Sequence, residues 1–365
     1  MKLRYLLRHL LYLILSSATI CACSHGSTEE KRIVLLIGDG MGFEEIRAAE
    51  LFNGKPFAVK SSAVFSGSIT TFNYSGEVTD SAASATAMAT GEKVSNGVIS
   101  RRIPGNSSDL KTVFETAKSK GYRTGLITTS YIIDATPAAF ISHSDSRADY
   151  CQISLGIFNF KPNLTIGGLK HLYIDDFALN GFAVYESLED YSSSQNPHIF
   201  IKLGDDTAQY EYDTLILSGI LPHNLSRSAA IATNYLNNTD KFILLVEGGR
   251  IDHAGHSGSI ENNVYETNEF FISAESIYNW LKKKEDYLMI ITADHETGGL
   301  NVITDNGAGS FPAVEWTSDS INGIYSHTDR EVPVYIYSDL LSENDFYFVE
   351  DNTDISRIIN CFIGK

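Results

Sequence analysis

The chain has 365 residues, of which 43% are hydrophobic and 20% charged, and its formal charge at pH 7 is −17. This length accommodates one large domain or two smaller ones, each with an apolar core. The acidic balance argues against nucleic acid or anionic lipid as a specific partner, and four cysteines are too few for a disulfide framework.

The first 22 residues are predicted to be a targeting segment. Three positive charges precede an apolar run over residues 10–22 that is too short for a membrane span. The run ends in ICAC, which resembles a bacterial lipoprotein cleavage site. We therefore expect a signal peptide over residues 1–22, a lipid on Cys23 and a tether over residues 24–32. The protein would be exported to the periplasm or cell envelope and anchored to a membrane; a plain secretory signal and an uncleaved anchor stay open.

Four apolar runs are typical of buried parallel strands. They cover residues 32–37, 123–128, 242–246 and 287–292. Helical periodicity precedes three of them, over residues 109–120, 225–236 and 262–284. This alternation indicates an α/β fold with a mostly parallel sheet.

Residues 79–91, TDSAASATAMATG, are almost all small. The composition predicts a closely packed helix that is capped at its start by Asp80 or Ser81. Helix packing alone would explain the run of small residues. The two polar side chains at its beginning need the rest of the sequence to be interpreted.

Chemically active side chains follow each predicted strand. The four segments are GDGMG with Asp39, DATPAAFISHSDSR over residues 134–147, EGGRIDHAGH with Glu247, Asp252, His253 and His256, and ADHETGG with Asp294 and His295. Because the carboxyl ends of parallel strands meet at one edge of a sheet, we expect these side chains to converge there.

The spacing of these residues suits metal ions. Asp252 and His256 are four residues apart, so on a helical turn they point the same way. Asp294 and His295 are adjacent, which suits a loop. Imidazole with carboxylate is a zinc ligand set, whereas carboxylates with a hydroxyl suit magnesium. A single histidine is ordinarily a structural core residue, but that alternative does not explain the whole set.

Six segments together resemble the alkaline phosphatase family. They are LLIGDGMG (35–42), TDSAASATAMATG (79–91), DATPAAFISHSDSR (134–147), VEGGRIDHAGH (246–256), TADHETGG (292–299) and His327-Thr328 with VPVY (332–335). The resemblance implies a three-layer α/β sandwich, with a mostly parallel central sheet and helices on both faces, as one catalytic domain over residues 33–365. Since only about 30 residues separate Gly299 from His327, the crown insertion over the site should be small.

The same resemblance implies two zinc ions and one magnesium ion. Carried over by position, the ligand sets are Asp252, His256 and His327 for the first zinc, Asp39, Asp294 and His295 for the second, and Asp39, Thr136 and Glu247 for magnesium, with Asp134 in or just behind that last set. Asp134 stands where vertebrate members carry His, which favours magnesium over a third zinc.

The resemblance also implies roles in catalysis. Ser81 matches the nucleophile, Arg147 the arginine that binds phosphate, and Asp80 the acid that steadies this arginine. Ser81 would lie at a helix N-terminus, which favours an anion, and the second zinc would lower the pKa of its hydroxyl. His253 stands where some members have Lys or Trp, and is expected to contact phosphate through water or magnesium-bound water. Asp329 replaces a usual Gly, so the shape of that loop is open.

The implied activity is the hydrolysis of small phosphate monoesters, with broad specificity, through a phosphoserine. One alternative is a phosphodiesterase of the same superfamily, which often uses Thr as nucleophile and lacks the matching arginine. The other is a non-catalytic lipoprotein that binds metal and phosphate, which would not need Ser81. Family members are commonly dimers, so a homodimer stays open. Residues 148–241 match least, and whether Cys151 and Cys361 pair is undetermined.

Overall fold

The computed structural model describes residues 30–364. The predicted signal peptide, the lipid site at Cys23 and most of the tether therefore lie outside the described residues. Strand β1 (Lys31–Gly38) begins two residues before the domain start that we predict. Within residues 30–364, we find no helix whose length and apolar character would let it cross a membrane.

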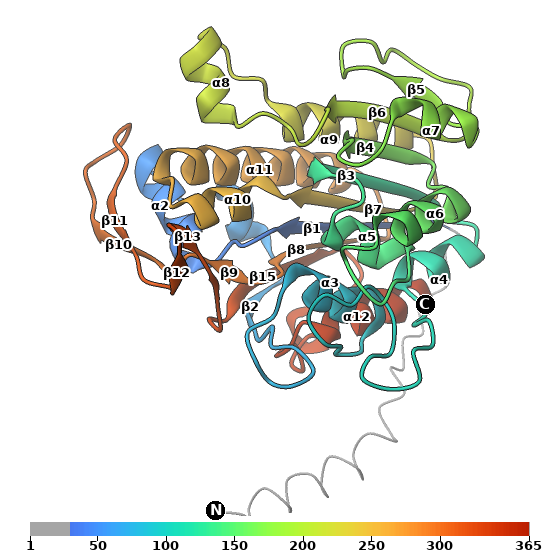
Figure 1. The fold of residues 1–365 in the computed structure, drawn as a ribbon, viewed down its shortest axis with the longest axis horizontal. Coiled ribbons are helices and arrows are strands. Elements are labelled where there is room, and N and C mark those ends of the chain that lie inside the picture. The colour runs from blue at the N-terminus through green and yellow to red at the C-terminus, as the bar shows by residue number, and fades with distance from the viewer. Residues whose placement is uncertain (1–29, 365) are drawn as a thin grey trace, which may run out of the picture.

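A nine-stranded sheet forms the centre of the molecule (Figure 1). Its strands, in spatial order, are β2 (Phe65–Ile69), β15 (Val332–Ser338), β8 (Tyr287–Ala293), β1, β7 (Lys241–Gly248), β3 (Arg123–Tyr131), β4 (Leu164–Gly168), β6 (Ile199–Gly204) and β5 (Ala183–Tyr185). Strand β15 runs antiparallel to both neighbours, and every other pair is parallel. The prediction of a mostly parallel sheet is confirmed.

The four strands that the sequence predicts are the four adjacent strands β8, β1, β7 and β3 at the middle of the sheet. The apolar side chains of residues 33–37 and 242–246 are fully buried. Strands covered on both faces have no solvent-facing positions, so their sequences are continuously apolar instead of alternating. This is why these strands were recognisable from the sequence.

Helices cover both faces of the sheet, as predicted (Figure 1). One face carries α2 (Phe43–Asn53), α8 (Glu211–Ser218), α9 (Asn224–Leu236), α10 (Arg250–Ser257) and α11 (Ile260–Leu281). The other carries α3 (Ser81–Thr90), α4 (Val113–Ser119), α5 (Ala135–Ile141), α6 (Tyr150–Phe160) and α12 (Thr353–Gly364), while α7 (Ile174–Leu179) packs beside β5 at the edge. Two short 3₁₀ turns complete the helical elements at Ala58–Ser62 and Glu343–Asp345.

Two of the three predicted helices begin and end within a few residues of their expected bounds, as α9 and α11. The third, expected from residue 109, begins at Val113 instead. Its start is set by a capping box, in which Thr112 Oγ1 accepts from Glu115 N and Glu115 Oε2 accepts from Thr112 N. Residues 109–111 therefore lie before the helix.

Helix α3 is the predicted small-residue helix. Asp80 is its N-cap, with Oδ1 accepting from Ala83 N at 2.9 Å. Residues 81–89 are all buried, because α5 and α12 pack against this helix. Alanine, serine and threonine keep the helix thin enough for this close packing, which places its first residue at the end of the sheet.

The region after β8 forms short two-stranded sheets. They pair β10 (Leu300–Thr304) with β11 (Ala313–Trp316), β12 (Ser320–Ile321) with β13 (Ile324–Tyr325), and β9 (Glu296–Thr297) with β14 (His327–Thr328). This is the small insertion that the sequence predicts. The β12–β13 hairpin lies next to the site described below.

The tight packing of α3 can be tested by adding volume to it. We expect Ala85→Leu to lower the free energy of unfolding by about 1–3 kcal/mol, because the extra atoms have no space between α3 and its neighbours. Ala230→Leu, at an exposed position of α9, should change it by less than about 0.5 kcal/mol. Urea denaturation measures both, and equal stabilities of the two variants would contradict the packing argument.

Candidate active site

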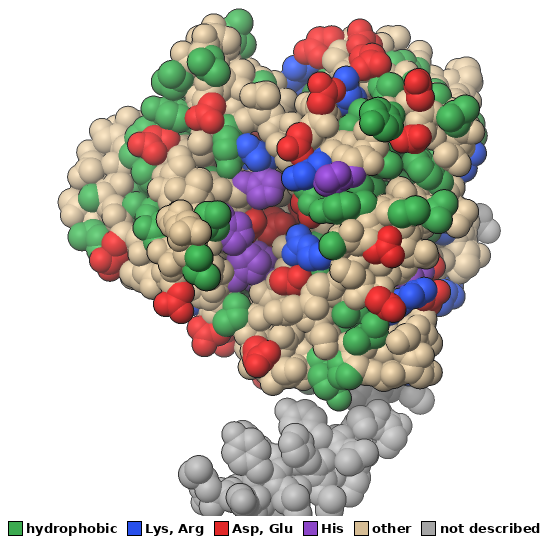
Figure 2. Space-filling model, viewed as in Figure 1, with side chains coloured by type: hydrophobic (Ala, Val, Ile, Leu, Met, Phe, Trp, Pro, Cys, Tyr) green, Lys and Arg blue, Asp and Glu red, His purple; other side chains and the backbone are tan. Residues whose placement is uncertain are grey.

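Four neighbouring strands deliver side chains to one edge of the sheet. Strands β1, β7 and β8 end in register, with Gly38 beside both Gly248 and Ala293. Asp39 and Asp294 follow directly, and Glu247 is the second-last residue of β7. Figure 2 shows a hollow on this face where histidine side chains and basic side chains (lysine or arginine, in one colour) gather around a floor of acidic groups. The convergence expected from the sequence is observed.

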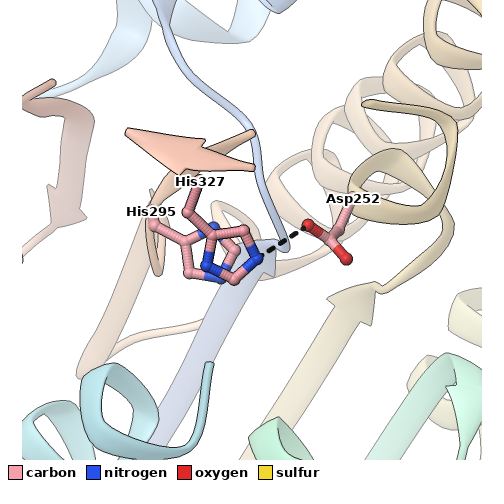
Figure 3. Close-up of side chains that lie close together, drawn as sticks. All are labelled: Asp252, His295 and His327. Atoms are coloured by element: carbon pink, nitrogen blue, oxygen red, sulfur yellow. Dashed lines mark ion pairs between the residues drawn. The ribbon is translucent and has the colours of Figure 1, made fainter. Parts of the chain in front are cut away.

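The first predicted ligand set closes into a triangle. His256 Nε2 lies 3.3 Å from Asp252 Oδ1, and His327 Nε2 lies 3.6 Å from the same oxygen. The two Nε2 atoms are 3.2 Å apart. Asp252 and His256 come from α10, one turn apart, and His327 comes from β14 (Figure 3 shows Asp252 with His327 and its stacked neighbour His295). Three lone-pair donors thus face a common point.

The second set is also assembled. His295 Nε2 lies 3.2 Å from Asp294 Oδ2 and 3.6 Å from Asp39 Oδ1. Asp294 Oδ1 accepts from Gly40 N and from His295 N, which holds the carboxylate in place. Asp39 Oδ1 and Asp294 Oδ2 are buried and have no hydrogen-bond donor. Buried anionic oxygens without donors are costly unless a cation neutralises them.

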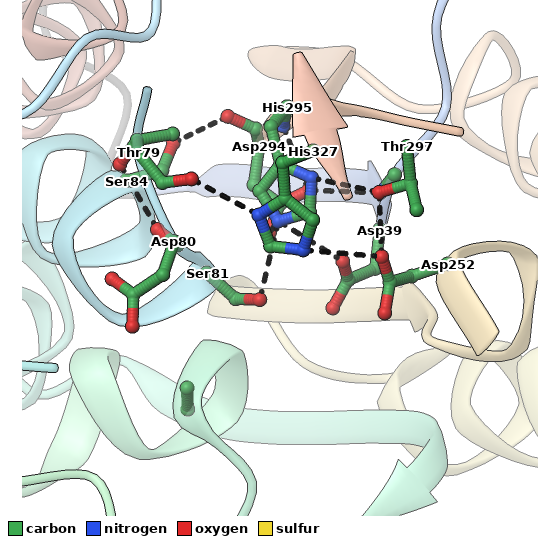
Figure 4. Close-up of polar contacts among 12 residues, drawn as sticks. Asp39, Thr79, Asp80, Ser81, Ser84, Asp252, Asp294, His295, Thr297 and His327 are labelled. Atoms are coloured by element: carbon green, nitrogen blue, oxygen red, sulfur yellow. Dashed lines mark hydrogen bonds and ion pairs between the residues drawn. The ribbon is translucent and has the colours of Figure 1, made fainter. Parts of the chain in front are cut away.

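The three histidines each use Nδ1 for a contact behind the site, and Figure 4 shows this for His295 and His327. The acceptors of their Nδ1–H groups are Tyr325 O for His256, Thr79 O for His327 and Thr297 Oγ1 for His295. A carbonyl oxygen only accepts, so Nδ1 carries the hydrogen and the Nε2 lone pair points into the site. Burial and the neighbouring His295 lower the pKa of His327 to about 4, which keeps this ring neutral. Such second partners are typical of histidines that bind metal.

A third group of oxygens lies behind Asp39. Both carboxylate oxygens of Glu247 and the hydroxyl of Thr136 are buried without a partner. Asp134 accepts from Ser130 Oγ through Oδ2 at 2.5 Å. Burial, followed by the charge of Asp134, raises the pKa of Glu247 to about 8. Carboxylate and hydroxyl oxygens alone make up this group, and that is a magnesium-type donor set.

Ser81 is the first residue of α3 and faces these groups. Its Oγ lies 3.2 Å from His295 Nε2 and is buried with it (Figure 4). The helix is tied to the ligand loop because Ser84 Oγ donates to Asp294 O at 2.6 Å, and Asn352 Nδ2 donates to Ser84 Oγ. The Ser81 hydroxyl is therefore held at a helix N-terminus beside the second ligand set.

Arg147 lies across the mouth of the site. Its Nη1 donates to Asp80 Oδ2 and its Nη2 to Asp134 Oδ1, each at 3.2 Å. Its side chain is 35% exposed, so one face of the guanidinium remains open to a ligand. Two carboxylates fix the plane of the guanidinium, which suits two-point recognition of an anion.

His253 has a partner that the sequence did not reveal. Arg250 Nη1 donates to His253 Nδ1 at 2.7 Å, and the guanidinium stacks 3.6 Å from the Tyr210 ring. Because Nδ1 is the acceptor, a neutral His253 carries its hydrogen on Nε2 and can donate from it. Burial, together with the charge of Arg250, lowers the pKa of His253 against the effect of Asp252.

Thr297 was also missed by the sequence reasoning. Its hydroxyl donates to Asp252 Oδ1 at 2.6 Å and accepts from His295 Nδ1 at 3.1 Å, so it connects the two ligand sets. Gly40, with φ +72°, makes room for it: a Cβ there would lie 2.7 Å from Thr297 Oγ1. A hydroxyl residue two positions after a ligand histidine is the sequence signal that could have identified it.

The structure brings all predicted site residues to this one edge of the sheet. A further cluster, made of Glu211, His223 and Glu269, lies elsewhere. Glu211 accepts from the backbone N–H groups of His223 and Asn224, and Glu269 accepts from His223 Nδ1. These contacts hold the turn before α9. Cys151 and Cys361 are exposed free thiols and do not pair with each other.

The sequence model of the alkaline phosphatase family matches residues 30–161 and 222–339. Alkaline phosphatase 3 of Bacillus subtilis is 32% identical over 92% of this chain and 72% of its own length. The Escherichia coli alkaline phosphatase is 28% identical over 82% of this chain and 77% of its own length. The chain spans 60% of the repressible alkaline phosphatase of Saccharomyces cerevisiae and 63% of alkaline phosphatase 4 of Bacillus subtilis.

Solved structures show the same fold. The alkaline phosphatase of the Antarctic bacterium TAB5 superposes with a TM-score of 0.78 at 23% identity, over 92% of this chain and 98% of that one. The Thermus thermophilus alkaline phosphatase gives 0.80 at 19% identity, over 96% and 94%. The three-layer α/β architecture is thereby confirmed.

The raised pKa of Glu247 leads to a prediction for the pH dependence of stability in the metal-free protein. The folded pKa of Glu247, about 8, lies above the ordinary value of 4.5 for a glutamate, so the folded state binds the extra proton. The free energy of unfolding should therefore fall by a few kcal/mol as the pH rises from about 5 to about 9. Glu247→Gln should remove part of this fall, because Glu266 and Glu211 also have raised pKa values, and exposed Glu275→Gln should leave the fall unchanged. Thermal unfolding in EDTA gives the slopes; an unchanged slope in Glu247→Gln would refute the assignment.

The bridging hydroxyl of Thr297 makes a second prediction. Thr297→Val keeps the shape but removes a donor to Asp252 and an acceptor for His295, so affinity for a divalent cation should fall roughly 10–100-fold. Thr297→Ser should retain it. The matched control is Thr165→Val, because Thr165 Oγ1 is buried without a partner in β4. Competition with a chelator measures the affinity, and wild-type binding by Thr297→Val would contradict the bridge.

Proposed function

The chain belongs to the alkaline phosphatase family, and on that premise we propose that it is a phosphomonoesterase with two zinc ions, one magnesium ion and a phosphoserine intermediate. The observation that carries the proposal is the position of Ser81. A nucleophile at a helix N-terminus, 3.2 Å from a ligand histidine and near a guanidinium, has no use in a protein that only stores metal.

The residues fit the metals that the family requires. The donorless oxygens of Asp39 and Asp294, with the oriented imidazoles, support two zinc positions. The partnerless oxygens of Glu247 and Thr136 support the magnesium position. A His-to-Asp variant of the TAB5 enzyme is described with Mg bound in its M3 site, which agrees with an acidic residue in such a site. When bound, these ions would lower the pKa of hydroxyl groups and neutralise charge on the oxygens around phosphorus.

The chain's own residues perform the remaining work. Arg147 binds two non-bridging oxygens of the phosphate, and Asp80 and Asp134 keep its guanidinium in plane. Ser81 Oγ, after losing its hydroxyl proton, forms a bond to phosphorus as the bond to the leaving oxygen breaks, and the leaving oxygen takes up a proton to depart as the alcohol. The N-terminus of α3 favours the resulting phosphoserine dianion. Water then cleaves the ester on Ser81 and releases phosphate, which regenerates the hydroxyl.

His253 is proposed to assist in phosphate binding. Arg250 occupies Nδ1 of this ring, so Nε2–H is available as a neutral donor toward phosphate or toward a water between them. Because positioning and charge carry most of the catalysis of phosphoryl transfer, an extra donor adds orientation without adding covalent chemistry.

The export proposal rests on the sequence alone. The positive start, the apolar run over residues 10–22 and Cys23 support a lipoprotein held at a membrane of the cell envelope. Such a location would place the enzyme where it meets phosphate esters outside the cytoplasm.

Ser81→Ala tests the covalent step. With zinc and magnesium supplied, turnover of p-nitrophenyl phosphate should fall at least about a thousandfold, because no other hydroxyl occupies the start of α3. Metal content should match that of wild type and of the exposed control Ser276→Ala.

The same assay distinguishes the proposed phosphomonoesterase from the phosphodiesterase alternative. Wild type should hydrolyse the mono-ester far faster than bis-p-nitrophenyl phosphate, since the diester lacks the third non-bridging oxygen and the second negative charge of the mono-ester and carries a second alcohol group in their place. A preference for the diester, or wild-type turnover by Ser81→Ala, would overturn the proposal.

A further inference from the structure

A cavity extends outward from the candidate active site. It has a volume of about 960 Å³ and opens to the surface. His256 and His327 form its inner wall, so it begins where the first ligand set ends. Val78 and Thr79 line it from the loop before α3, and the β12–β13 hairpin lines it from the other side. A group esterified to a phosphate at Ser81 can extend into this space past His256 and His327.

The hairpin presents apolar side chains to the cavity. Ile321 is 75% exposed and Ile324 is 60% exposed, and Tyr325 stands beside them. Large aliphatic groups at the rim of a cavity gain free energy when a ligand covers them. Polar atoms of Asn96 and Ser326 are also present, so the cavity accepts a partly apolar alcohol.

The carboxylates of the cavity lining are not balanced by basic side chains. Asp80, Asp319 and Asp329 line it, and the lining contains no lysine or arginine. Asp80 is paired with Arg147, whereas the other two carboxylates form no ion pair within residues 30–364. Such a wall repels anionic groups of a ligand and attracts cationic ones.

We propose that this cavity is the leaving-group subsite, and that it selects monoesters of uncharged or cationic alcohols with an apolar or aromatic body. Esters whose alcohol carries further phosphate or carboxylate groups are disfavoured by Asp319 and Asp329. The inference rests on the proposed phosphomonoesterase function and narrows its substrate class. The phosphate end is recognised by Arg147, and the alcohol end by the β12–β13 hairpin.

Three substrates test the selection in wild type. These are 1-naphthyl phosphate, glycerol 1-phosphate and fructose 1,6-bisphosphate, compared by kcat/KM with zinc and magnesium present. We expect the naphthyl ester to be the best and the bisphosphate the poorest. Raising the ionic strength should reduce the discrimination against the bisphosphate, because salt screens the carboxylates.

Paired substitutions separate the two features of the cavity. Ile321→Ser with Ile324→Ser should lower kcat/KM for the naphthyl ester about tenfold, and that for glycerol phosphate by less than about twofold. Ile216→Ser with Ile220→Ser, similarly exposed on and after α8, is the matched control and should change neither.

Charge reversal tests the acidic side chains of the cavity. Asp319→Lys with Asp329→Lys should raise kcat/KM for the bisphosphate about tenfold relative to the naphthyl ester. The control with the same change in net charge is Asp175→Lys with Glu343→Lys, at exposed positions that do not line the cavity.

Binding provides a readout that does not need turnover. Naphthylmethylphosphonate has a C–P bond that is not hydrolysed, and methylphosphonate lacks the ring. We expect the first to bind more tightly to wild type, and the difference to disappear in the double isoleucine variant. If wild type hydrolyses none of the esters, the proposed function fails. If it hydrolyses them with ratios that the hairpin variants leave unchanged, the function stands and the subsite is refuted.

Discussion

The structure depends on the presence of several acids that the protein buries together and does not itself neutralise. Asp39, Asp294 and Glu247 present oxygens that accept no hydrogen bond, within one small volume. Burial and the charges of Asp294 and Asp252 raise the pKa of Asp39 well above its usual range. Folding alone gains nothing from this arrangement, because like charges in a low dielectric repel. Divalent cations would convert the same arrangement into a stable one, so the electrostatic cost of these buried acids is what a bound metal ion would relieve.

The parallel sheet and helix α3 are arranged around that cluster. Strands buried on both faces end in register, so the residues that follow them have little freedom to lie elsewhere. Helix α3 packs on the sheet because its side chains are small, and this brings the Ser81 hydroxyl to the second ligand set. Contacts such as Ser84 with the Asp294 carbonyl tie the nucleophile to the ligands. Fold stability and chemical geometry therefore depend on the same packing.

The orientation of the ligand side chains comes from groups behind them. His256 and His327 use backbone carbonyls of Tyr325 and Thr79, and these belong to the same short segments that line the leaving-group cavity. The β12–β13 hairpin therefore has two features in our proposal, since its Tyr325 carbonyl orients the candidate ligand His256 and its isoleucines offer apolar surface to the alcohol of the substrate. A small insertion can change substrate preference without disturbing the sheet.

The central strands, helix α3 and the candidate ligands at the strand ends could be predicted from the sequence, because buried runs, capping residues and strand-end acids have local signatures. Strands β4, β5 and β6, in the segment that matches the family least, were not predicted because they are short, and β2 and β15 at the opposite edge of the sheet were not predicted either. The contact of Thr297 with Asp252, the stacking of Arg250 on Tyr210 and the acidic cavity were not predicted either. These contacts join segments far apart in the chain, and they follow from the tertiary structure because they depend on how separate loops pack at one edge of the sheet.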